Sequence, residues 1–309
     1  MLPKPPNTVA IEVITGTYNT GKGLIFAKSL RGPKNRDTGS PRQALMIHPE
    51  GLGGNHTLIE RHARWLITRD LFDLVLLPDR RGAGASSPIT HKMTLREQAE
   101  DMQRLLDRMG IQSPIAVIGY SYGGIVGLTL AGIDPRIACA VMVAAAPETQ
   151  SQGGFERLLW RWGIIPRLVR YQIRRSLGKR PLQQTNFDPG YDSPSPRVMS
   201  TLFTDALKAT TPDLADSLQY EYEATHDPHA AALPPDFALD IPVAQIIGEG
   251  DERWSTTLPA GWHDRVPNFT RKVIADAWMH HDIYVKAEAY SVALAEVLEE
   301  ICPVCKQSG

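Results

Sequence analysis

The sequence predicts an α/β protein in which a mostly parallel sheet is covered by helices on both faces. Three observations predict it. Continuous rather than alternating apolar runs recur along the chain, which is typical of strands buried on both faces. Helical patterns separate these runs, and glycine-rich turns follow several of them. A chain of 309 residues can bury a sizeable core as one large domain of this class or as two smaller ones.

The N-terminal part begins with two expected strands, at residues 9–14 and 23–28. A Thr/Asn/Gly turn joins them, so a hairpin is predicted. Thr94 should cap a later helix of about sixteen residues, because Glu97 three positions on completes a capping box. The elements expected between the hairpin and Thr94 are a strand at 44–47, a helix at 56–69 and a strand at 74–79.

The remaining strands and helices follow the same alternation, with one long interruption. The strands are expected at 114–118, 138–146, 241–247 and 269–275, and the helices at 125–131, between the last two strands, and at 283–301. The pattern breaks over 148–236, which predicts a helical cap between two parts of one core, 1–147 and 237–309.

The cap segment has two halves of opposite charge. Residues 155–180 are basic and apolar at helical spacing, whereas 205–227 are acidic. The basic helices could bind a membrane surface or an anionic substrate. We favour a lid whose apolar face covers the sheet and whose charges are solvated.

Composition limits the function classes. The net charge of −1 argues against a general nucleic-acid binder. The three cysteines are too few for a disulfide framework, and Cys302 and Cys305 are expected in a frayed tail without metal. Without a signal-peptide core or a run of ~18 apolar residues, the expected location is the cytoplasm.

The stretch Gly-Tyr-Ser-Tyr-Gly at 119–123 lies between an expected strand and an expected helix. A strand that turns at once into a helix leaves the residue at the apex with a positive φ. Small neighbours then keep the strand and the helix from colliding. Ser121 is therefore the predicted nucleophile, held at the N-terminus of a helix.

A serine hydroxyl needs a base, usually an imidazole oriented by a carboxylate. The acid should follow a late strand and the base should precede the last helix, which selects Asp251 and His280. Asp251 could instead cap a helix, and Glu249 could serve as the acid. His281 is the alternative base, and Asp282 could cap the last helix.

An oxyanion formed on acyl attack needs two donors already directed at it. The backbone N–H of Tyr122 is expected to be one. The second is assigned to the N–H of Glu50, in the glycine-rich loop at 48–54. The sequence of that loop argues against phosphate binding, because neither a P-loop nor a dinucleotide-binding pattern is present.

These stretches together resemble the α/β-hydrolase superfamily. The motifs that carry the resemblance are His-Pro-Glu-Gly-Leu-Gly-Gly at 48–54, Asp-Arg-Arg-Gly-Ala-Gly-Ala-Ser at 79–86, the serine stretch, Gly-Glu-Gly-Asp at 248–251 and His-His-Asp-Ile-Tyr at 280–284. The resemblance implies an eight-stranded sheet, a cap inserted after the sixth strand, a Ser121-Asp251-His280 triad and no cofactor. Capped esterases and proline iminopeptidase-like enzymes look most similar, although Pro49 stands where the family usually has glycine.

The expected function is cleavage of a carboxylic ester or lactone through an acyl-enzyme. An iminopeptidase-like aminopeptidase using Glu221 and Glu223 for a substrate amine, a cofactor-free C–C hydrolase or oxygenase, and a receptor are the alternatives. The expected partner is a small ester-like molecule, and a homodimer is an assembly that the sequence allows. The cap aromatics expected to wall the pocket are Trp160, Trp162, Tyr171, Phe203 and Tyr220.

Overall fold

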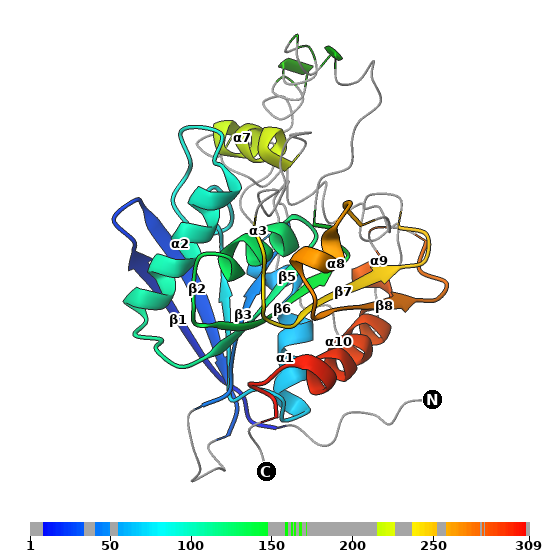
Figure 1. The fold of residues 1–309 in the computed structure, drawn as a ribbon. Helices are drawn as coiled ribbons and strands as arrows, with labels where there is room; N and C mark the ends of the chain where they lie inside the picture. Colours follow the sequence, from blue (N-terminus) through cyan, green and yellow to red (C-terminus); the bar gives the residue numbers. More distant parts are fainter. Residues whose placement is uncertain are drawn as a thin grey trace.

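A computed structural model gives the fold (Figure 1). It describes residues 9–33, 41–49, 55–147, 215–225, 237–251, 258–278, 280 and 282–306, with isolated positions between 158 and 171. The described strands form one eight-stranded sheet in the order β1-β2-β4-β3-β5-β6-β7-β8. The strands are β1 (Glu12–Asn19), β2 (Leu24–Arg31), β3 (Gln43–Ile47), β4 (Leu74–Pro78), β5 (Ile115–Tyr120), β6 (Ile137–Val143), β7 (Val243–Gly248) and β8 (Phe269–Ile274).

The sheet is mostly parallel, as predicted. Only the pairings β1–β2 and β2–β4 are antiparallel among the described strands. β3, β5, β6 and β7 are buried along almost their whole length, so their apolar runs were visible in the sequence. β5 lies inside the sheet, and its carboxyl end carries Ser121.

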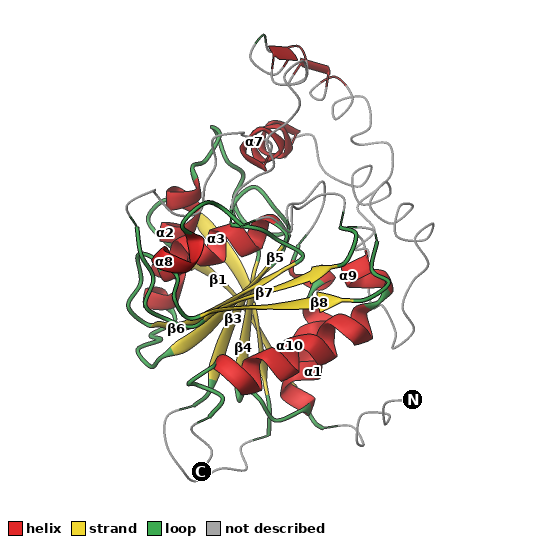
Figure 2. Cartoon of the chain, turned by 45° about the vertical axis from the view of Figure 1, so that its right-hand side comes forward, coloured by secondary structure: helices red, strands yellow, loops and turns green. Residues whose placement is uncertain are grey.

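Helices cover both faces (Figures 1 and 2). The helices on one face are α1 (Glu60–Thr68), α9 (Asp282–Val285) and α10 (Ala287–Ile301), and those on the other are α2 (Leu95–Arg108), α3 (Tyr122–Ala131) and α8 (Trp262–Arg265). Each layer has its own apolar cluster against the sheet. No helix in the described part of the chain has the length and hydropathy that crossing a membrane requires.

The N-terminal hairpin is confirmed, but β1 begins at Glu12 rather than at residue 9, and both strands end later than predicted. β1 pairs with β2 from Glu12 to Asn19, beyond the expected end at residue 14. β1 is an edge strand with mostly exposed side chains, so its C-terminal half carries no apolar signal. β2 continues to Arg31 because its second half also pairs with β4.

The capping box predicted at Thr94 is confirmed. Glu97 N donates to Thr94 Oγ1 over 3.2 Å, and Thr94 N donates to Glu97 Oε2 over 2.8 Å.

Two other helix predictions differ from the structure. The expected helix at 283–301 is instead α9 and α10, because Lys286 between them leaves the helical region at φ −107° and ψ 37°. The helix expected at 56–69 begins as a short 3-10 turn, His56–Leu58, before α1.

The sixth strand ends earlier than its apolar run. β6 stops at Val143 because Ala144 adopts a positive φ of 46°, which a strand cannot contain. The alanines at 144–146 stay buried all the same, so hydrophobicity alone could not mark the end. The Ala145 carbonyl accepts a hydrogen bond of 2.7 Å from Gln245 Nε2 in β7.

The expectation of a frayed cysteine tail is wrong. Cys302 is fully buried and its Sγ lies 2.8 Å from the Sγ of Cys139 in β6. Val304 is only 1% exposed. The tail packs against the core because its few apolar side chains continue the buried face of α10, which a stretch this short did not reveal.

The predicted cap at 148–236 lies mostly outside the described residues. Within it, α7 (Ala215–Thr225) is described and lies above the ends of α2 and α3 (Figures 1 and 2). The core boundaries at 147 and 237 stay a prediction. The sheet does resume with β7 after the interruption, as the sequence indicated.

Candidate active site

Ser121 occupies the turn between β5 and α3. Its backbone has φ 50° and ψ −127°, the positive φ that the sequence predicted for this apex. A Cβ added at Gly119 would come within 2.1 Å of the Gly123 carbonyl oxygen. The strand and helix therefore meet so closely that only glycine fits at position 119.

The elbow also packs tightly on the end of β3. A Cβ at Gly123 would lie 2.4 Å from the carbonyl oxygen of His48, the first residue after β3. This contact places the start of the 48–54 loop beside the serine turn. Tyr122, whose N–H was predicted to bind an oxyanion, opens α3 and is buried. Such first-turn N–H groups have no acceptor inside their own helix.

Ser121, His280 and Asp251 come together from three loops. Ser121 Oγ lies 2.9 Å from His280 Nε2, and His280 Nδ1 lies 3.2 Å from Asp251 Oδ2. Ser121 is fully buried and the Asp251 side chain is 1% exposed, whereas His280 is 16% exposed. The imidazole thus bridges a buried hydroxyl and a buried carboxylate through its two nitrogens.

The other acidic residues considered near the triad, Glu249 and Asp282, accept hydrogen bonds from backbone N–H groups. Glu249 accepts a hydrogen bond of 3.3 Å from Asp276 N, on the surface. Asp282 accepts one of 2.8 Å from Trp278 N, which ties the start of α9 to the loop carrying His280. Burial, and next the charges of Asp251 and Asp282, raise the pKa of Tyr290 behind them. His281 lies outside the described residues.

His48 begins the loop that was assigned the second oxyanion donor. Its Nδ1 donates to the Pro49 carbonyl over 2.6 Å, and its Nε2 accepts from Arg80 N over 3.0 Å. Burial, and next the charge of Arg80, lower the pKa of His48 to about 3. The ring is therefore neutral at physiological pH. Glu50 itself lies outside the described residues.

The turn after β4 carries buried ionisable groups to which the sequence analysis assigned no individual role. Asp79 accepts hydrogen bonds from His56 N and Ala85 N, over 2.8 and 2.9 Å. Burial opposes ionisation, but His56 and its other partners hold the pKa of Asp79 below its usual value. Arg80, 2% exposed, is ion-paired with Glu221 of α7. The only sequence signal was the glycine-rich Asp-Arg-Arg motif itself.

The predicted pocket residues are only partly described. Trp162 and Tyr171 are 59% and 60% exposed, and Tyr220 is partly buried on α7. Trp160 and Phe203 lie outside the described residues. The pocket wall therefore stays a prediction. Among the described residues, no group of three or more His, Cys, Asp or Glu side chains is arranged to hold a metal ion.

The family model described as alpha/beta hydrolase fold matches residues 45–286, more than three quarters of this chain. The chain belongs to the alpha/beta hydrolase fold family. A Cronobacter turicensis protein named as a carbamate hydrolase, RutD, is 31% identical over 111 residues, 35% of this chain and 39% of its own length. The polyketide transferase grgF of a Penicillium species is 28% identical over 178 residues, 56% of this chain and 55% of its own length. The chain thus spans about half or less of either relative.

Solved alpha/beta hydrolases share the fold across nearly the whole chain. The 2-hydroxy-6-oxo-6-phenylhexa-2,4-dienoate hydrolase of Rhodococcus sp. strain RHA1 has a TM-score of 0.65 at 20% identity, covering 94% of this chain and 100% of that one. A thermophilic esterase from Thermogutta terrifontis has a TM-score of 0.62 at 21% identity, covering 94% and 98%. At this identity the likeness concerns the fold alone.

The buried imidazoles predict a loss of stability in mild acid. His62, like His48, has a pKa lowered to about 3, by burial first and then by Arg61. Between pH 3 and 6.5 the unfolded chain binds protons that the folded protein excludes. Stability should therefore rise with pH through this window, by up to about 1.4 kcal/mol per unit for each imidazole.

Denaturant unfolding at several pH values between 5 and 6.5 would measure this slope above the carboxylate range. The variant His62→Gln should lose about half of the histidine contribution. Replacement of His91 by Gln serves as the control for loss of an imidazole, because its side chain is 55% exposed. An unaltered slope in His62→Gln would contradict a neutral buried imidazole.

Proposed function

We propose that this protein is a serine hydrolase that cleaves a carboxylic ester or a lactone through an acyl-enzyme. The observation that carries the proposal is the 2.9 Å contact from His280 Nε2 to Ser121 Oγ at the start of α3. A hydroxyl held in this way is within reach of a base that can remove its proton. Asp251, on the other imidazole nitrogen, supplies the orienting carboxylate.

In the proposed reaction, His280 takes the proton from Ser121 as Oγ attacks the substrate carbonyl. Asp251 stabilises the imidazolium that forms. The protonated His280 then gives its proton to the leaving alcohol oxygen, which leaves an acyl group on Ser121. Water then attacks that acyl group as His280 takes a proton from it, and the protonated His280 returns the proton to Ser121 Oγ as the bond to the acyl group breaks and the acid is released.

The oxyanion of each tetrahedral intermediate is assigned to the N–H groups of Tyr122 and Glu50. The support for Tyr122 is its place at the first position of α3. The support for the 48–54 loop is the close approach of Gly123 to the His48 carbonyl. We further propose that 148–236 forms a helical cap that covers a small-molecule substrate, with the aromatic side chains listed above as its pocket wall.

The names of similar proteins are compatible with acyl chemistry on this fold. They include an enol-lactonase from Burkholderia xenovorans, at a TM-score of 0.62 and 17% identity, besides the esterase and the protein named as a carbamate hydrolase.

The contacts of Glu221 and Glu223 argue against the aminopeptidase alternative, which needs these carboxylates for a substrate amine. Glu221 is ion-paired with Arg80. Glu223 accepts a hydrogen bond of 2.6 Å from Gln219.

A substrate panel tests the proposal. The wild-type protein would be assayed with nitrophenyl esters of increasing chain length, a lactone and a proline arylamide. We expect the esters or the lactone to be cleaved with the highest kcat/KM. Faster cleavage of the arylamide would favour the aminopeptidase. A protein without turnover on any of them would contradict the proposal.

The choice of acid can be tested by a matched pair of variants. Asp251→Asn keeps the shape of the side chain but removes the charge that favours the correct tautomer of His280. We expect kcat to fall about 10⁴-fold. Glu249→Gln, two residues away and directed at the surface, should keep kcat within about twofold. The reverse order of effects would assign the acid to Glu249.

A further inference from the structure

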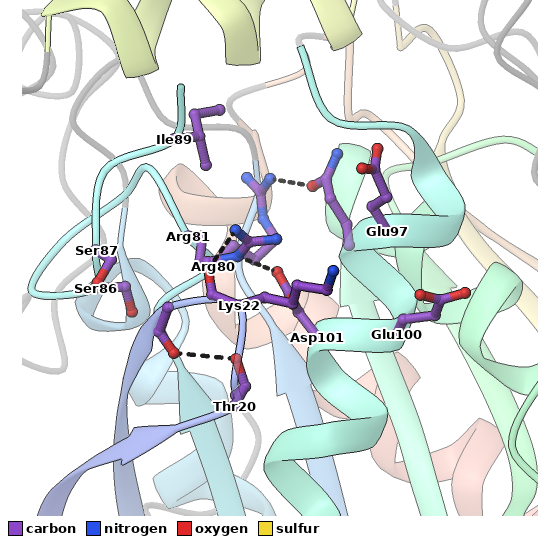
Figure 3. A network of polar contacts seen from close by, with 12 residues as sticks. Thr20, Lys22, Arg80, Arg81, Ser86, Ser87, Ile89, Glu97, Glu100 and Asp101 are labelled. Carbon is purple, nitrogen blue, oxygen red and sulfur yellow. Dashed lines mark hydrogen bonds and ion pairs between the residues drawn. The ribbon is translucent and has the colours of Figure 1, made fainter. Parts of the chain in front are cut away.

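Arg80 is a buried cation whose guanidinium binds groups on three parts of the fold: α2, the loop after β3 and α7. It follows β4 and is 2% exposed. One terminal nitrogen donates to Gln98 Oε1 of α2 over 2.9 Å. The other donates to the Pro49 carbonyl over 3.0 Å and is ion-paired with the carboxylate of Glu221. Figure 3 shows Arg80 beside Arg81 and close to α2.

Glu221 reaches Arg80 from α7. Ser217, Glu221 and Ala224 are buried at the spacing of a single helical face, and Gln219 is buried as well. Ser217 Oγ accepts a hydrogen bond of 2.8 Å from Ile89 N in the same segment that carries Arg80. The position of α7 therefore determines whether Arg80 has its counter-ion.

The same guanidinium contacts the loop after β3 and the side chain of Tyr122. The Pro49 carbonyl accepts hydrogen bonds from Arg80 and from His48, so two donors hold it. The carbon of the guanidinium lies 5.4 Å from the centre of the Tyr122 ring. The Tyr122 hydroxyl accepts from Gln98 Nε2 over 2.9 Å. Arg80 thus links the loop after β3 to the residue that follows the nucleophile.

We propose that Arg80 is a positioning residue: it holds the Pro49 carbonyl, and with it the peptide group that begins the proposed oxyanion loop, and it depends on Glu221 of α7 to do so. This inference rests on the proposed serine hydrolase function. The Pro49 carbonyl belongs to a planar peptide group, so fixing it also fixes the plane of that group at the start of the oxyanion loop. A buried guanidinium without its carboxylate is unfavourable. Loss of Glu221 should therefore release Arg80 from Pro49, although no catalytic group has been changed.

Arg81 provides a matched control. It is also largely buried, is ion-paired with Asp101 of α2 and donates to the Lys22 carbonyl over 3.0 Å (Figure 3). Unlike the partners of Arg80, Asp101 and Lys22 lie in neither α7 nor the loop after β3. Arg81→Gln and Asp101→Asn therefore break a buried ion pair in the same turn without touching the proposed linkage.

The experiment compares Arg80→Gln and Glu221→Gln with those two controls, using a nitrophenyl ester. We expect kcat to fall about 10- to 100-fold in the first two variants, with KM changed by about twofold or less.

The double variant should be no slower than Arg80→Gln alone, because both single changes remove the same linkage. Arg80→Lys keeps the charge with a single nitrogen and should be intermediate. The controls should lower Tm but keep kcat.

A trifluoromethyl ketone gives a second readout that a purely structural role would not affect. Ser121 Oγ adds to the ketone carbon, its proton passes to His280, and the ketone oxygen becomes an oxyanion. In the Arg80 and Glu221 variants, the inhibition constant of the ketone should rise by the same factor as kcat falls. If the Arg80 and Glu221 variants match the Arg81 and Asp101 variants in kcat and in ketone affinity, the inference is overturned. A wild type that neither turns over esters nor binds the ketone overturns the proposed function instead.

Discussion

Replacement of Ser121 by Ala should lower ester turnover by about 10⁶-fold, which is the largest effect we expect from a single substitution. The variant keeps the fold and the imidazole but has no oxygen to form the acyl-enzyme. Residual activity would come only from substrate binding and oxyanion stabilisation. The measurement is kcat on the best ester of the panel, with circular dichroism to show that the variant is folded.

A second replacement at the same position controls for backbone strain. Ser121 has φ 50° and ψ −127°, which an L-residue adopts only at a cost, whereas glycine adopts it readily. Ser121→Gly should be as inactive as Ser121→Ala but more stable by about 1 kcal/mol in denaturant unfolding. Turnover retained in both variants would show that another residue is the nucleophile.

Replacement of Gly119 by Ala should prevent the protein from folding stably. The added methyl group would lie 2.1 Å from the Gly123 carbonyl oxygen and 2.5 Å from the Gly124 Cα, so backbone would have to move. Neither partner is the end of a flexible side chain. We expect the free energy of unfolding to fall by at least about 3 kcal/mol, with loss of soluble protein or of the cooperative transition.

Gly127, on the helix α3 that follows the elbow, is the matched control. A Cβ there would first meet Val117 Cγ2 at 3.2 Å, a side-chain methyl that can give way. Alanine also has a higher helix propensity than glycine by about 1 kcal/mol. Gly127→Ala should therefore change stability by no more than about 1 kcal/mol in either direction. Equal effects at 119 and 127 would contradict the steric account of the elbow.

The sequence predicted the parts of this fold that have a strong local signal. The central strands were found because burial on both faces makes them continuously apolar, and Ser121 because two glycines flank it at fixed spacing. The break at Lys286 was missed because the apolar pattern continues on both sides of it. The early end of β6 was missed for the same reason at Ala144.

The surroundings of the candidate site were less predictable, because they depend on contacts between distant segments. Asp251 and His280 could be chosen from their order after particular strands, and the structure brings both to Ser121. Glu221 was interpreted as a partner for a substrate amine, but it contacts Arg80, 141 residues earlier in the chain. No local pattern around either residue indicates that pairing. It follows only from where α7 docks.

The most direct test of the central claim is the intact mass of the protein after treatment with a fluorophosphonate. An activated Ser121 attacks phosphorus, its proton passes to His280 and fluoride leaves, so one phosphonyl group remains on Oγ. We predict a single adduct on the wild type, located at Ser121 by peptide mapping, and no adduct on Ser121→Ala. A folded wild type without adduct, or an adduct that persists in Ser121→Ala, would contradict the assignment of Ser121 as the nucleophile.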